Sequence, residues 1–583
     1  MPTLEWIGKE KVINHHQEVP FRVLDRRYSF DESGQHAGDN GSENMIIHGD
    51  NLEALKALLP RFEGQVKCIY IDPPYNTGNE GWVYNDNVND PKIKKWLGEV
   101  VGKEGEDLSR HDKWLCMMYP RLKLLQKLLA EDGVIFISID DTEYANLKLI
   151  CDEIFGGNCF VSNISWQRTY STRNDSKGIV NEVEHLLVYS KQPGWSPNKL
   201  PRTAEMNSIY KNPDNDVQAW ASDNPFAPGA ATHQGMVYAI QHPFTGEMIY
   251  PSNRACWRYQ QDQMLEIMRG WCDYELRDIN DARERAAVCG ISESEIRKGV
   301  QAIVLSKSLE ASVEQAKKVY KRGQWPKFYF TKGGHGGIRR KTYIDSVEGK
   351  PPTNLWQYAD VGHTDEAAKT LKAIFEGQAT FDTPKPPRLI ERILQIAGDS
   401  ETLILDSFAG SGTTAHAVLN MNKADGGNRK FILVEMMDYA DSITAERVRR
   451  VIRGYGEGKS EVEGTGGSFS YYELGEPLLI GENLNEAVAP EKIRGYIWFM
   501  ETKTPYTPAA GENLYYLGRH NDTGYYFYYE PQRITVLDYD FLATVTEKAG
   551  GTVIYADRCS IDDSKLSQMG IVFKKIPRDI SRL

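Results

Sequence analysis

The sequence predicts an α/β protein built on a mostly parallel, doubly wound sheet whose strands come from two distant parts of the chain. Over residues 45–155, short apolar runs typical of buried strands alternate with amphipathic helical patterns. The same alternation returns over residues 388–435. Between these stretches, residues 196–375 are rich in Pro, Gly, Trp and Tyr and lose the alternation, which indicates a separate domain inserted into the sheet.

The first part of the sheet is expected over residues 45–195. Its helices carry leucines at helical spacing, and its strands are apolar runs that end at acidic residues or glycines. Asp132 and Gly133 are expected to separate a helix from the strand that follows, and the last two strands to form a hairpin with a basic loop. The expected strands are 45–48, 66–71, 134–139, 160–166 and 183–190, and the expected helices are 51–59, 114–129 and 143–155.

The second part of the sheet is expected over residues 376–475, after the inserted domain of residues 196–375, which also holds a charged helical segment around 279–320. Residues 31–44 have the composition of a solvated linker, so residues 1–44 are expected to form an N-terminal arm. Residues 476–583 are expected to form a small C-terminal domain with an aromatic hairpin. The elements expected are helices 388–397, 413–421 and 537–545 and strands 402–405, 431–435, 515–517, 525–529 and 552–555.

The composition is that of a globular protein, with 40% hydrophobic and 26% charged residues. Lys and Arg number 69 against 81 Asp and Glu, a net charge of −12, which leaves room only for a local basic face toward nucleic acid. The eight cysteines form no CxxC pair, so neither a metal site nor a disulfide framework is expected. No apolar run is long enough to span a bilayer, and a cytoplasmic location is expected.

A glycine-rich turn follows the strand expected at residues 402–405 and opens the next helix, in the sequence Asp406-Ser-Phe-Ala-Gly-Ser-Gly-Thr. Glycines allow a ligand to approach the backbone, and a helix N-terminus presents free N–H groups. Glu435 ends the next strand, where a carboxylate can hold ribose hydroxyls. The motif by itself is compatible with a nicotinamide cofactor, a flavin or S-adenosylmethionine.

A second motif, Asp72-Pro73-Pro74-Tyr75, stands directly at the end of a buried strand. Two consecutive prolines stop the strand and stiffen the backbone. The Asp72 carboxylate and the Pro73 carbonyl then offer two acceptors at the carboxyl edge of the sheet, which suits an exocyclic amine. Tyr75 offers a ring on which a base can stack.

With these two motifs the sequence resembles the amino-group DNA methyltransferases of the beta class, in which the DPPY motif precedes the FxGxGT motif. The resemblance is closest to the modification subunits of type III restriction systems and covers residues 44–475. It rests also on the segments IYIDPPYNTGNE, FISIDDTE, EIFG, HLLVYSK and FDTPKPPRLI. It implies a circularly permuted, Rossmann-like methyltransferase sheet, an inserted target-recognition domain, S-adenosylmethionine as cofactor and adenine N6 in duplex DNA as target.

The resemblance also implies roles for individual residues. The catalytic set is Asp72, Pro73, Pro74 and Tyr75. The cofactor set is Asp50, Lys385, Asp406, Phe408, Ala409, Gly410, Ser411, Gly412, Thr413 and Glu435. Asp50 alternatively caps the helix that follows it. Trp166 and the basic loop after it match the family's loop near the flipped base, although a buried core tryptophan is an equally good interpretation of Trp166.

The expected DNA contacts lie in two basic loops, and Lys332, Arg339, Arg340 and Lys341 occupy a stretch without acidic residues. The other expected contacts are Trp166, Arg168, Arg173 and Lys177. Type III modification subunits work as dimers and can recruit a helicase-nuclease restriction subunit, so both partners are expectations here. The aromatic residues of the tail either serve such an interface or fill the tail's own core.

Several alternatives stay open at the level of sequence. Cytosine-N4 methylation is the runner-up within the same class of enzyme, and a solitary methyltransferase without a restriction partner is another. An NAD-dependent oxidoreductase is compatible with the glycine turn and Glu435 but makes no use of residues 72–75. A DNA-binding module without activity would need only the middle domain.

Overall fold

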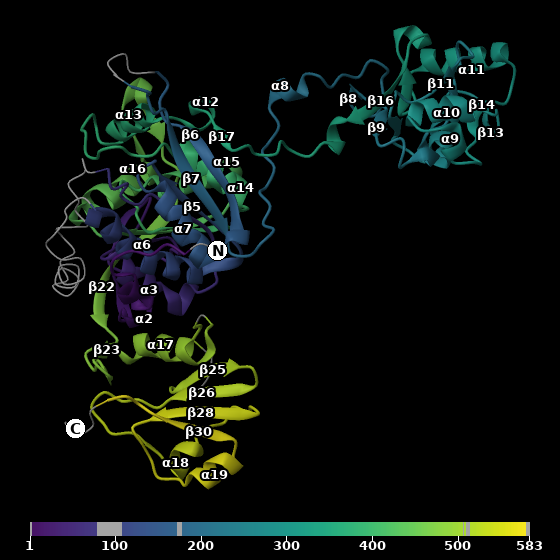
Figure 1. Ribbon diagram of the computed structural model, residues 1–583. Helices are drawn as coiled ribbons and strands as arrows, with labels where there is room; N and C mark the ends of the chain where they lie inside the picture. Colours follow the sequence, from purple (N-terminus) through teal and green to yellow (C-terminus); the bar gives the residue numbers. More distant parts are fainter. Residues whose placement is uncertain (1–2, 78–107, 172–177, 505, 509–512, 579–583) are drawn as a thin grey trace. The chain divides into compact units, whose positions relative to one another are not determined.

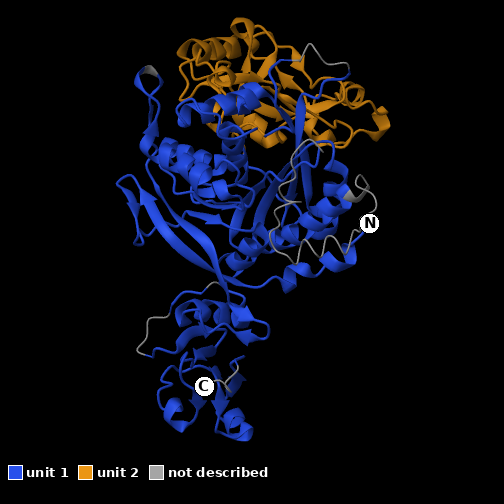
Figure 2. Cartoon of the chain, turned by 90° about the vertical axis from the view of Figure 1, so that its left-hand side faces the viewer, with its two compact units in different colours: residues 1–198, 352–583 blue, residues 199–351 orange. Residues whose placement is uncertain are grey.

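The computed structural model describes residues 3–77, 108–171, 178–504, 506–508 and 513–578 (Figure 1). The chain forms two compact units (Figure 2). The first comprises residues 1–198 and 352–583, and the second is the insertion of residues 199–351. The inserted domain was expected at 196–375, whereas the inserted unit spans 199–351 and residues 352–375 belong to the first unit. The reason is that β17 (Leu355–Trp356) pairs with a strand of the main sheet.

The main sheet of the first unit has the strand order β17-β6-β7-β5-β4-β18-β19-β3-β22-β1-β2. Neighbouring strands from β5 to β22 run parallel, whereas β7 is antiparallel to both β5 and β6. The strands not yet given are β1 (Arg22–Asp31), β2 (Gly34–His36), β3 (Met45–His48), β4 (Val66–Ile71), β5 (Leu129–Ile139), β6 (Phe160–Gln167), β7 (Val183–Ser190), β18 (Leu403–Asp406), β19 (Lys430–Glu435) and β22 (Ser468–Pro477). The expected circularly permuted sheet is thus present.

Helices cover the central strands, which are buried on both faces as expected for parallel strands. Ile69 and Ile71 of β4 pack into a core with leucines of α3 and α6, while Tyr70 between them is also buried on the other face. The helices of this unit that bear on the site are α3 (Asn51–Phe62), α6 (Leu108–Leu128), α7 (Tyr144–Phe155), α14 (Pro387–Ala397), α15 (Thr413–Asp425) and α16 (Glu446–Arg453). The helices expected in these regions are confirmed.

Two details of the sheet differ from expectation. Asp132 and Gly133 do not separate a helix from a strand, because β5 starts at Leu129 directly after α6. The pairing of β5 with β4 shifts register between Leu129 and Val134, so the two residues lie in an irregular part of the strand. A turn signal of this kind cannot be told from a strand irregularity in sequence alone.

The N-terminal residues are not an arm. Strand β1 pairs along its length with β22 and extends the main sheet, and β2 pairs back onto β1. Trp6, Val12 and Val19 are buried in the core under α3 and α6. Only the short stretch between β2 and β3 keeps the extended, strand-free course that the polar composition predicted. The polar residues mislead because β1 lies near the edge of the sheet, where polar side chains are tolerated.

The inserted unit has its own aromatic core, which includes Trp257, Trp271 and Phe330. Its principal sheets have the orders β11-β10-β14-β13 and β15-β16-β8. The elements named are β8 (Trp220–Asp223), β10 (Ile240–Gln241), β11 (Met248–Ile249), β13 (Tyr274–Arg277), β14 (Ala302–Leu305), β15 (Phe328–Phe330) and β16 (Ile338–Tyr343), with helices α9 (Gln261–Arg269), α10 (Ala282–Cys289) and α11 (Leu309–Arg322). The helical segment expected around 279–320 is in fact α10, β14 and α11 in succession.

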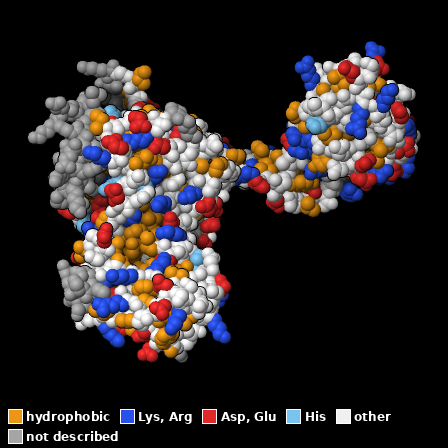
Figure 3. Space-filling view, turned by 60° about the horizontal axis from the view of Figure 1, so that its bottom comes forward, with side chains coloured by type: hydrophobic (Ala, Val, Ile, Leu, Met, Phe, Trp, Pro, Cys, Tyr) orange, Lys and Arg blue, Asp and Glu red, His pale blue; other side chains and the backbone are white. Residues whose placement is uncertain are grey.

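Charge is divided unequally between the two units. The inserted segment 199–351 holds 22 Lys and Arg against 18 Asp and Glu, whereas the rest of the chain holds 47 against 63. On the face shown in Figure 3, basic and acidic side chains are interspersed on both units. The positive excess therefore belongs to the insertion and is not concentrated into one large patch on this face.

The C-terminal residues form a four-stranded sheet in the order β25-β26-β28-β30, with α17 (Pro490–Thr502) before it. Its strands are β25 (Tyr516–His520), β26 (Thr523–Phe527), β28 (Gly551–Ala556) and β30 (Ile571–Lys575), and α18 (Tyr539–Leu542) is shorter than the helix expected at 537–545. Tyr526, Phe527 and Tyr529 are buried. The aromatic residues of the expected hairpin thus fill the tail's own core, and the alternative of an aromatic interface is not supported. Across the described residues, no helix is both long and apolar enough to cross a bilayer.

Candidate active site

The two sequence motifs meet because their strands are neighbours. β18 pairs in parallel with β4, with Ile404 opposite Cys68 and Leu405 opposite Ile69. Asp406 and Asp72 therefore leave the sheet at the same carboxyl edge, although 333 positions separate them in the sequence. From β4 the chain continues through α6 to β5 on one side, and from β18 through α15 to β19 on the other. Such a reversal is the point at which open α/β sheets bind ligands.

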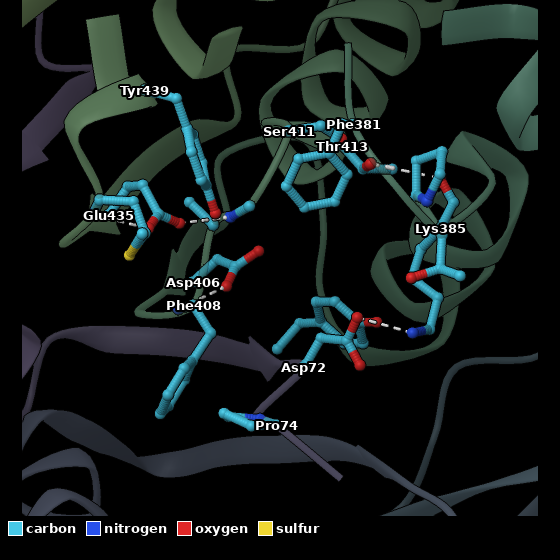
Figure 4. A pocket seen from close by; sticks show the side chains of 16 residues that line it. Asp72, Pro74, Phe381, Lys385, Asp406, Phe408, Ser411, Thr413, Glu435 and Tyr439 are labelled. Carbon is cyan, nitrogen blue, oxygen red and sulfur yellow. Dashed lines mark hydrogen bonds and ion pairs between the residues drawn. The ribbon is translucent and has the colours of Figure 1, made fainter. Parts of the chain in front are cut away.

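A cavity of about 300 Å³ opens at this edge, within the size range of small-molecule sites. It combines aromatic and aliphatic walls with a few charged groups (Figure 4). Figure 4 shows Glu435 and Tyr439 at one end of the cavity and Asp72 and Lys385 at the other. The lining residues are Tyr70, Asp72, Pro74, Phe381, Thr383, Pro384, Lys385, Asp406, Phe408, Ala409, Gly410, Ser411, Thr413, Glu435, Met437 and Tyr439.

Glu435, at the end of β19, ties two loops together. Its carboxylate accepts the Gly410 N–H at 2.8 Å and the Met437 N–H at 3.0 Å. Burial raises the pKa of Glu435 to about 7, against the lowering effect of these backbone N–H groups. Each carboxylate oxygen can accept a second hydrogen bond, so the group remains able to receive hydroxyl donors from a ligand.

Asp406 lines the cavity, but its carboxylate is engaged in the turn. It accepts the Phe408 N–H at 3.0 Å and the Thr414 hydroxyl at 2.6 Å. Burial raises its pKa to about 7. These bonds join the end of β18 to the first turn of α15, so Asp406 holds the glycine turn in shape.

The two glycines of the turn serve different purposes. Gly410 lines the cavity, and a Cβ there would lie 3.1 Å from the Phe381 ring. Gly412 is outside the lining and is the N-cap of α15 with φ 81°. A Cβ on Gly412 would lie 3.0 Å from the Thr444 carbonyl oxygen. Gly412 is thus required for the backbone conformation and for packing against Thr444, rather than for direct approach of a ligand.

Asp72 is held in a chain of buried charges. Its Oδ2 lies 2.6 Å from Lys385 Nζ, and its Oδ1 accepts the Tyr75 hydroxyl at 2.8 Å. Lys385 Nζ also lies 3.9 Å from Glu184 of β7. Burial disfavours the charge on Lys385, yet the nearby Asp72 and Glu184 raise its pKa overall. Lys385 therefore stays protonated and carries the positive charge next to Asp72.

Glu184 is a charged group that the sequence did not reveal as part of the site. It is 4% exposed, and burial raises its pKa. Arg168 lies 3.5 Å from the other oxygen of the Glu184 carboxylate. The only sequence signal of Glu184 was its position directly before the segment HLLVYSK, which gave no role. The antiparallel pairing of β6 with β7 brings Arg168, which directly follows β6, next to Glu184.

The loop of residues 72–76 is held in place by contacts with neighbouring residues. The Trp114 indole of α6 donates to the Pro74 carbonyl at 2.7 Å. Asn76 has a left-handed φ of 61° and is completely buried. Its side-chain amide donates to the Glu143 carboxylate, which also contacts the His111 ring at 2.6 Å. Glu143 thus anchors the loop after Tyr75, a role that its place at the start of α7 did not indicate.

Most predicted residues of the catalytic and cofactor sets line the cavity, but four of them do not. Asp72, Pro74, Lys385, Phe408, Ala409, Ser411 and Thr413 line it together with Asp406, Gly410 and Glu435. Pro73 is buried, and Tyr75 and Gly412 lie beside the lining rather than in it. Asp50 accepts the N–H groups of Leu52 and Glu53 and so caps α3. The structure thus supports the capping role of Asp50, and its contact with a cofactor stays a prediction.

Two of the predicted DNA contacts are wrong. Trp166 is fully buried and donates its indole N–H to the Gly362 carbonyl at 3.0 Å, so it is a core residue. Lys341 is fully buried in the inserted unit, where its ammonium contacts Asp214 and lies 2.6 Å from Asp216. A buried cation with two carboxylate partners has no face left for a phosphate.

The other predicted DNA contacts remain compatible with the structure or lie outside it. Lys332 is exposed, and Arg339 and Arg340 on β16 are partly exposed. Arg340 is paired with Asp223, and Arg339 donates to the Ser222 hydroxyl at 3.1 Å. Arg168 pairs with Glu184 at the cavity edge. Arg173 and Lys177 lie outside the described residues.

The fold and the site define an α/β enzyme in which an acidic, proline-stiffened loop and a nucleotide-type pocket share one edge of a sheet. Residues 66–446 match the DNA methylase family, which unites N6 and N4 enzymes, and the chain belongs to that family. The match includes both motifs and the whole inserted unit. Membership in this family argues against the oxidoreductase interpretation.

The chain is also similar to individual curated proteins. The chain is 32% identical over 445 residues to the Mod subunit of the type III restriction-modification enzyme StyLTI of Salmonella typhimurium, which covers 71% of this chain and 58% of that protein. The EcoPI Mod subunit of Escherichia phage P1 is 28% identical over 468 residues, covering 74% and 63%. The type II methyltransferase M.KpnI of Klebsiella pneumoniae is 30% identical over 408 residues, covering 70% and 84%. The chain thus spans about three fifths of the length of these two Mod subunits.

Proposed function

We propose that this chain transfers a methyl group from S-adenosylmethionine to N6 of adenine in duplex DNA, as the modification subunit of a type III restriction-modification system. The observation that carries the proposal is the meeting of Asp72 and the glycine turn in one cavity of about 300 Å³. Family membership supplies the reaction class. The choice of adenine over cytosine follows from Asp, rather than Ser, at the first position of the catalytic motif.

The residues of the cavity fit this cofactor. Aromatic walls from Phe381, Phe408 and Tyr439 suit a purine ring. The Glu435 carboxylate can accept ribose hydroxyls at the end away from Asp72. A ligand lying between these ends would place its reactive group beside Asp72. When bound, the cofactor supplies a methyl group attached to a positively charged sulfur. The methyl group is the part transferred, and the electrons of its bond stay on the sulfur.

The catalytic loop supplies acceptors for the amine. The adenine leaves the duplex and places its amino group at Asp72 and the Pro73 carbonyl. Because Asp72 Oδ1 now holds the Tyr75 hydroxyl and Oδ2 holds Lys385, an entering amine competes with the neutral Tyr75 donor. Release of the hydroxyl would free the Tyr75 ring to adjust against the base. The N6 lone pair would then attack the methyl carbon in line as the bond between methyl and sulfur breaks, and N6 would afterwards release its extra proton to solvent.

Substitution of Asp72 tests the catalytic role. Asp72→Asn keeps the shape of the side chain but replaces an acceptor oxygen with a donor, so transfer should fall at least about 100-fold while cofactor binding stays within about threefold. Asp141→Asn, an exposed carboxylate near the hairpin, is the matched control and should keep full activity. Methyl transfer to duplex DNA and calorimetry of cofactor binding give the two readouts. Full activity of Asp72→Asn would contradict the assignment.

Analysis of the product tests the choice of base. DNA methylated by the purified chain and then digested to nucleosides should contain N6-methyladenine and no N4-methylcytosine. The reverse result would overturn the adenine assignment but not the reaction class.

The homodimer and the restriction subunit are part of the same proposal. Light scattering of the full chain and co-purification with a helicase-nuclease subunit test them separately.

A further inference from the structure

The glycine turn is backed by a buried cation that no step of the proposed reaction uses. Arg447 of α16 is fully buried, and its guanidinium lies behind the turn. One terminal nitrogen donates to the Ser411 hydroxyl and to the Thr413 hydroxyl, both at 2.8 Å. The other lies 3.2 Å from the His416 ring. Both hydroxyl residues line the cavity.

This cation lacks a countercharge. Within the described residues, no carboxylate lies within ion-pair distance of Arg447, and its Nε has no hydrogen-bond partner. The groups that face it are hydroxyls, a histidine and the Tyr455 phenol. Burial lowers its pKa to about 10, and burial beside Arg447 keeps His416 neutral by lowering its pKa. A buried charge without a partner is costly, so a source of negative charge close by would stabilise the fold.

The Ser411 hydroxyl connects this charge to the cavity. Because its oxygen accepts from Arg447, its own proton is directed away from the guanidinium and is polarised by it. Thr413 differs, since its hydroxyl donates to the Lys385 carbonyl at 3.2 Å. Thr413 also begins α15, which has no side-chain cap at its N-terminus. The backbone N–H groups of that first turn add positive potential at the same place.

The nearby ammonium is not an alternative source of that positive charge. Lys385 already lies 2.6 Å from Asp72 and 3.9 Å from Glu184. Its charge is therefore balanced within the chain. Of the two cations, Lys385 and Arg447, only Arg447 has no acidic partner in the described part of the protein.

We infer that Arg447, acting through the Ser411 hydroxyl, is the positioning residue for a carboxylate group at the Asp72 end of the cofactor pocket. The inference rests on the proposed function, because the ligand carboxylate is that of the methionine portion of S-adenosylmethionine. Ser411 donates to the carboxylate, and Arg447 supplies the charge that makes this donor strong. The arrangement orients the ligand so that its opposite end reaches Glu435.

Calorimetry with two ligands tests this inference without measuring activity. The probes are S-adenosylmethionine and its decarboxylated form, which keeps the sulfonium and the nucleoside but lacks the carboxylate. The wild-type chain should prefer the carboxylated ligand at least about tenfold. Arg447→Met should reduce that preference below about threefold and leave binding of the decarboxylated ligand within about threefold of wild type. Ser411→Ala should do the same without removing a buried charge.

The matched control is Arg450→Met on the same helix, since Arg450 pairs with Glu446 and Glu376 rather than with the turn. It should retain the wild-type preference. Should Arg447→Met fail to fold, Ser411→Ala alone decides the inference. A preference that persists in the folded variants would overturn it. Failure of the wild-type chain to bind either ligand would instead overturn the proposed function, and the inference with it.

Discussion

At the scale of single residues, burial raises the pKa of two acids of the site above that of a solvent-exposed carboxylate. Glu435 and Asp406 both have a pKa of about 7 because they are buried. Asp406 joins the end of β18 to the first turn of α15 through Phe408 and Thr414, whereas Glu435 lies with Tyr439 at the end of the cavity away from Asp72. The two acids therefore play different roles despite similar ionisation.

Glu435 gives the cofactor affinity a pH dependence. Hydroxyl donors bind the ionised carboxylate, so affinity should rise as pH passes upward through about 7. Between pH 6 and pH 8 the ionised fraction grows about tenfold, and the association constant should grow by a similar factor. Calorimetry of S-adenosylmethionine binding across this range measures it. Glu435→Gln should bind more weakly and abolish the rise; a rise that persists would assign the titration to Asp406.

At the scale of elements, the turn between β18 and α15 determines the site. Helix α15 is preceded by Gly412 with φ 81° and followed by Gly426 with φ 70°. The first of these, Gly412, also packs against the backbone of Thr444. The turn, α15 and α16 thus form one packed unit, with Arg447 joining the helix to the loop.

Alanine at the two ends of α15 separates backbone strain from packing. Gly426→Ala meets no neighbouring atom within 4 Å and should cost about 1 kcal/mol, the price of a left-handed φ alone. Gly412→Ala adds a Cβ 3.0 Å from the Thr444 carbonyl and should cost about 1–2 kcal/mol more. Denaturant unfolding measures the stability, and calorimetry measures cofactor affinity, which should fall only for Gly412→Ala. Equal effects at both positions would refute the packing role.

At the scale of the whole molecule, the C-terminal residues are part of the catalytic body rather than an appended module. Phe499 of α17 is 3% exposed and belongs to the core that includes α3 and α6. Phe21 before β1 contacts Tyr496 with ring centroids 5.0 Å apart. Both ends of the described chain thus stabilise the sheet that carries the site.

Truncation of Phe499 tests this packing. Phe499→Ala should destabilise the first unit by about 3–4 kcal/mol, because it leaves a cavity in a shared core. Met500→Ala, at an adjacent position that is 42% exposed, should change stability by less than about 0.5 kcal/mol. The unfolding of the first unit in denaturant is monitored through the loss of cofactor binding. Equal stability of the two variants would show that the tail folds independently.

The inserted unit carries the excess of positive charge, and we expect its basic residues to contribute to the salt dependence of DNA affinity. Arg339→Gln should reduce the slope of log affinity against log salt by about one, if it removes one phosphate contact. Lys317→Gln on α11, an exposed lysine of the same unit, is the charge-matched control for a position outside the basic loop. Fluorescence anisotropy with duplex DNA over a range of salt measures both. An unchanged slope for Arg339→Gln would place the phosphate contacts on another surface.

The sequence by itself determined the two motifs, the construction of the sheet from two distant parts of the chain and most of its strands. These features follow from local signals, because apolar runs, prolines and glycines act on the backbone where they stand. The N-terminal strand β1 escaped detection because polar side chains are tolerated near a sheet edge. The burial of Lys341 was equally hidden, since burial depends on partners far away in the chain, whereas for Trp166 the core position was one of the two interpretations that the sequence allowed.

Only the tertiary structure decided which side chains meet. The pairing of β4 with β18 brought Asp72 to the glycine turn, and the antiparallel pairing of β7 with β5 brought Glu184 to the same edge of the sheet, near Lys385. Arg447 reached Ser411 because α16 packs behind the turn. Nothing in the local sequence distinguishes these charged residues from solvated ones. Their roles arise from desolvation and from contacts across hundreds of residues, and both exist only once the sheet has formed.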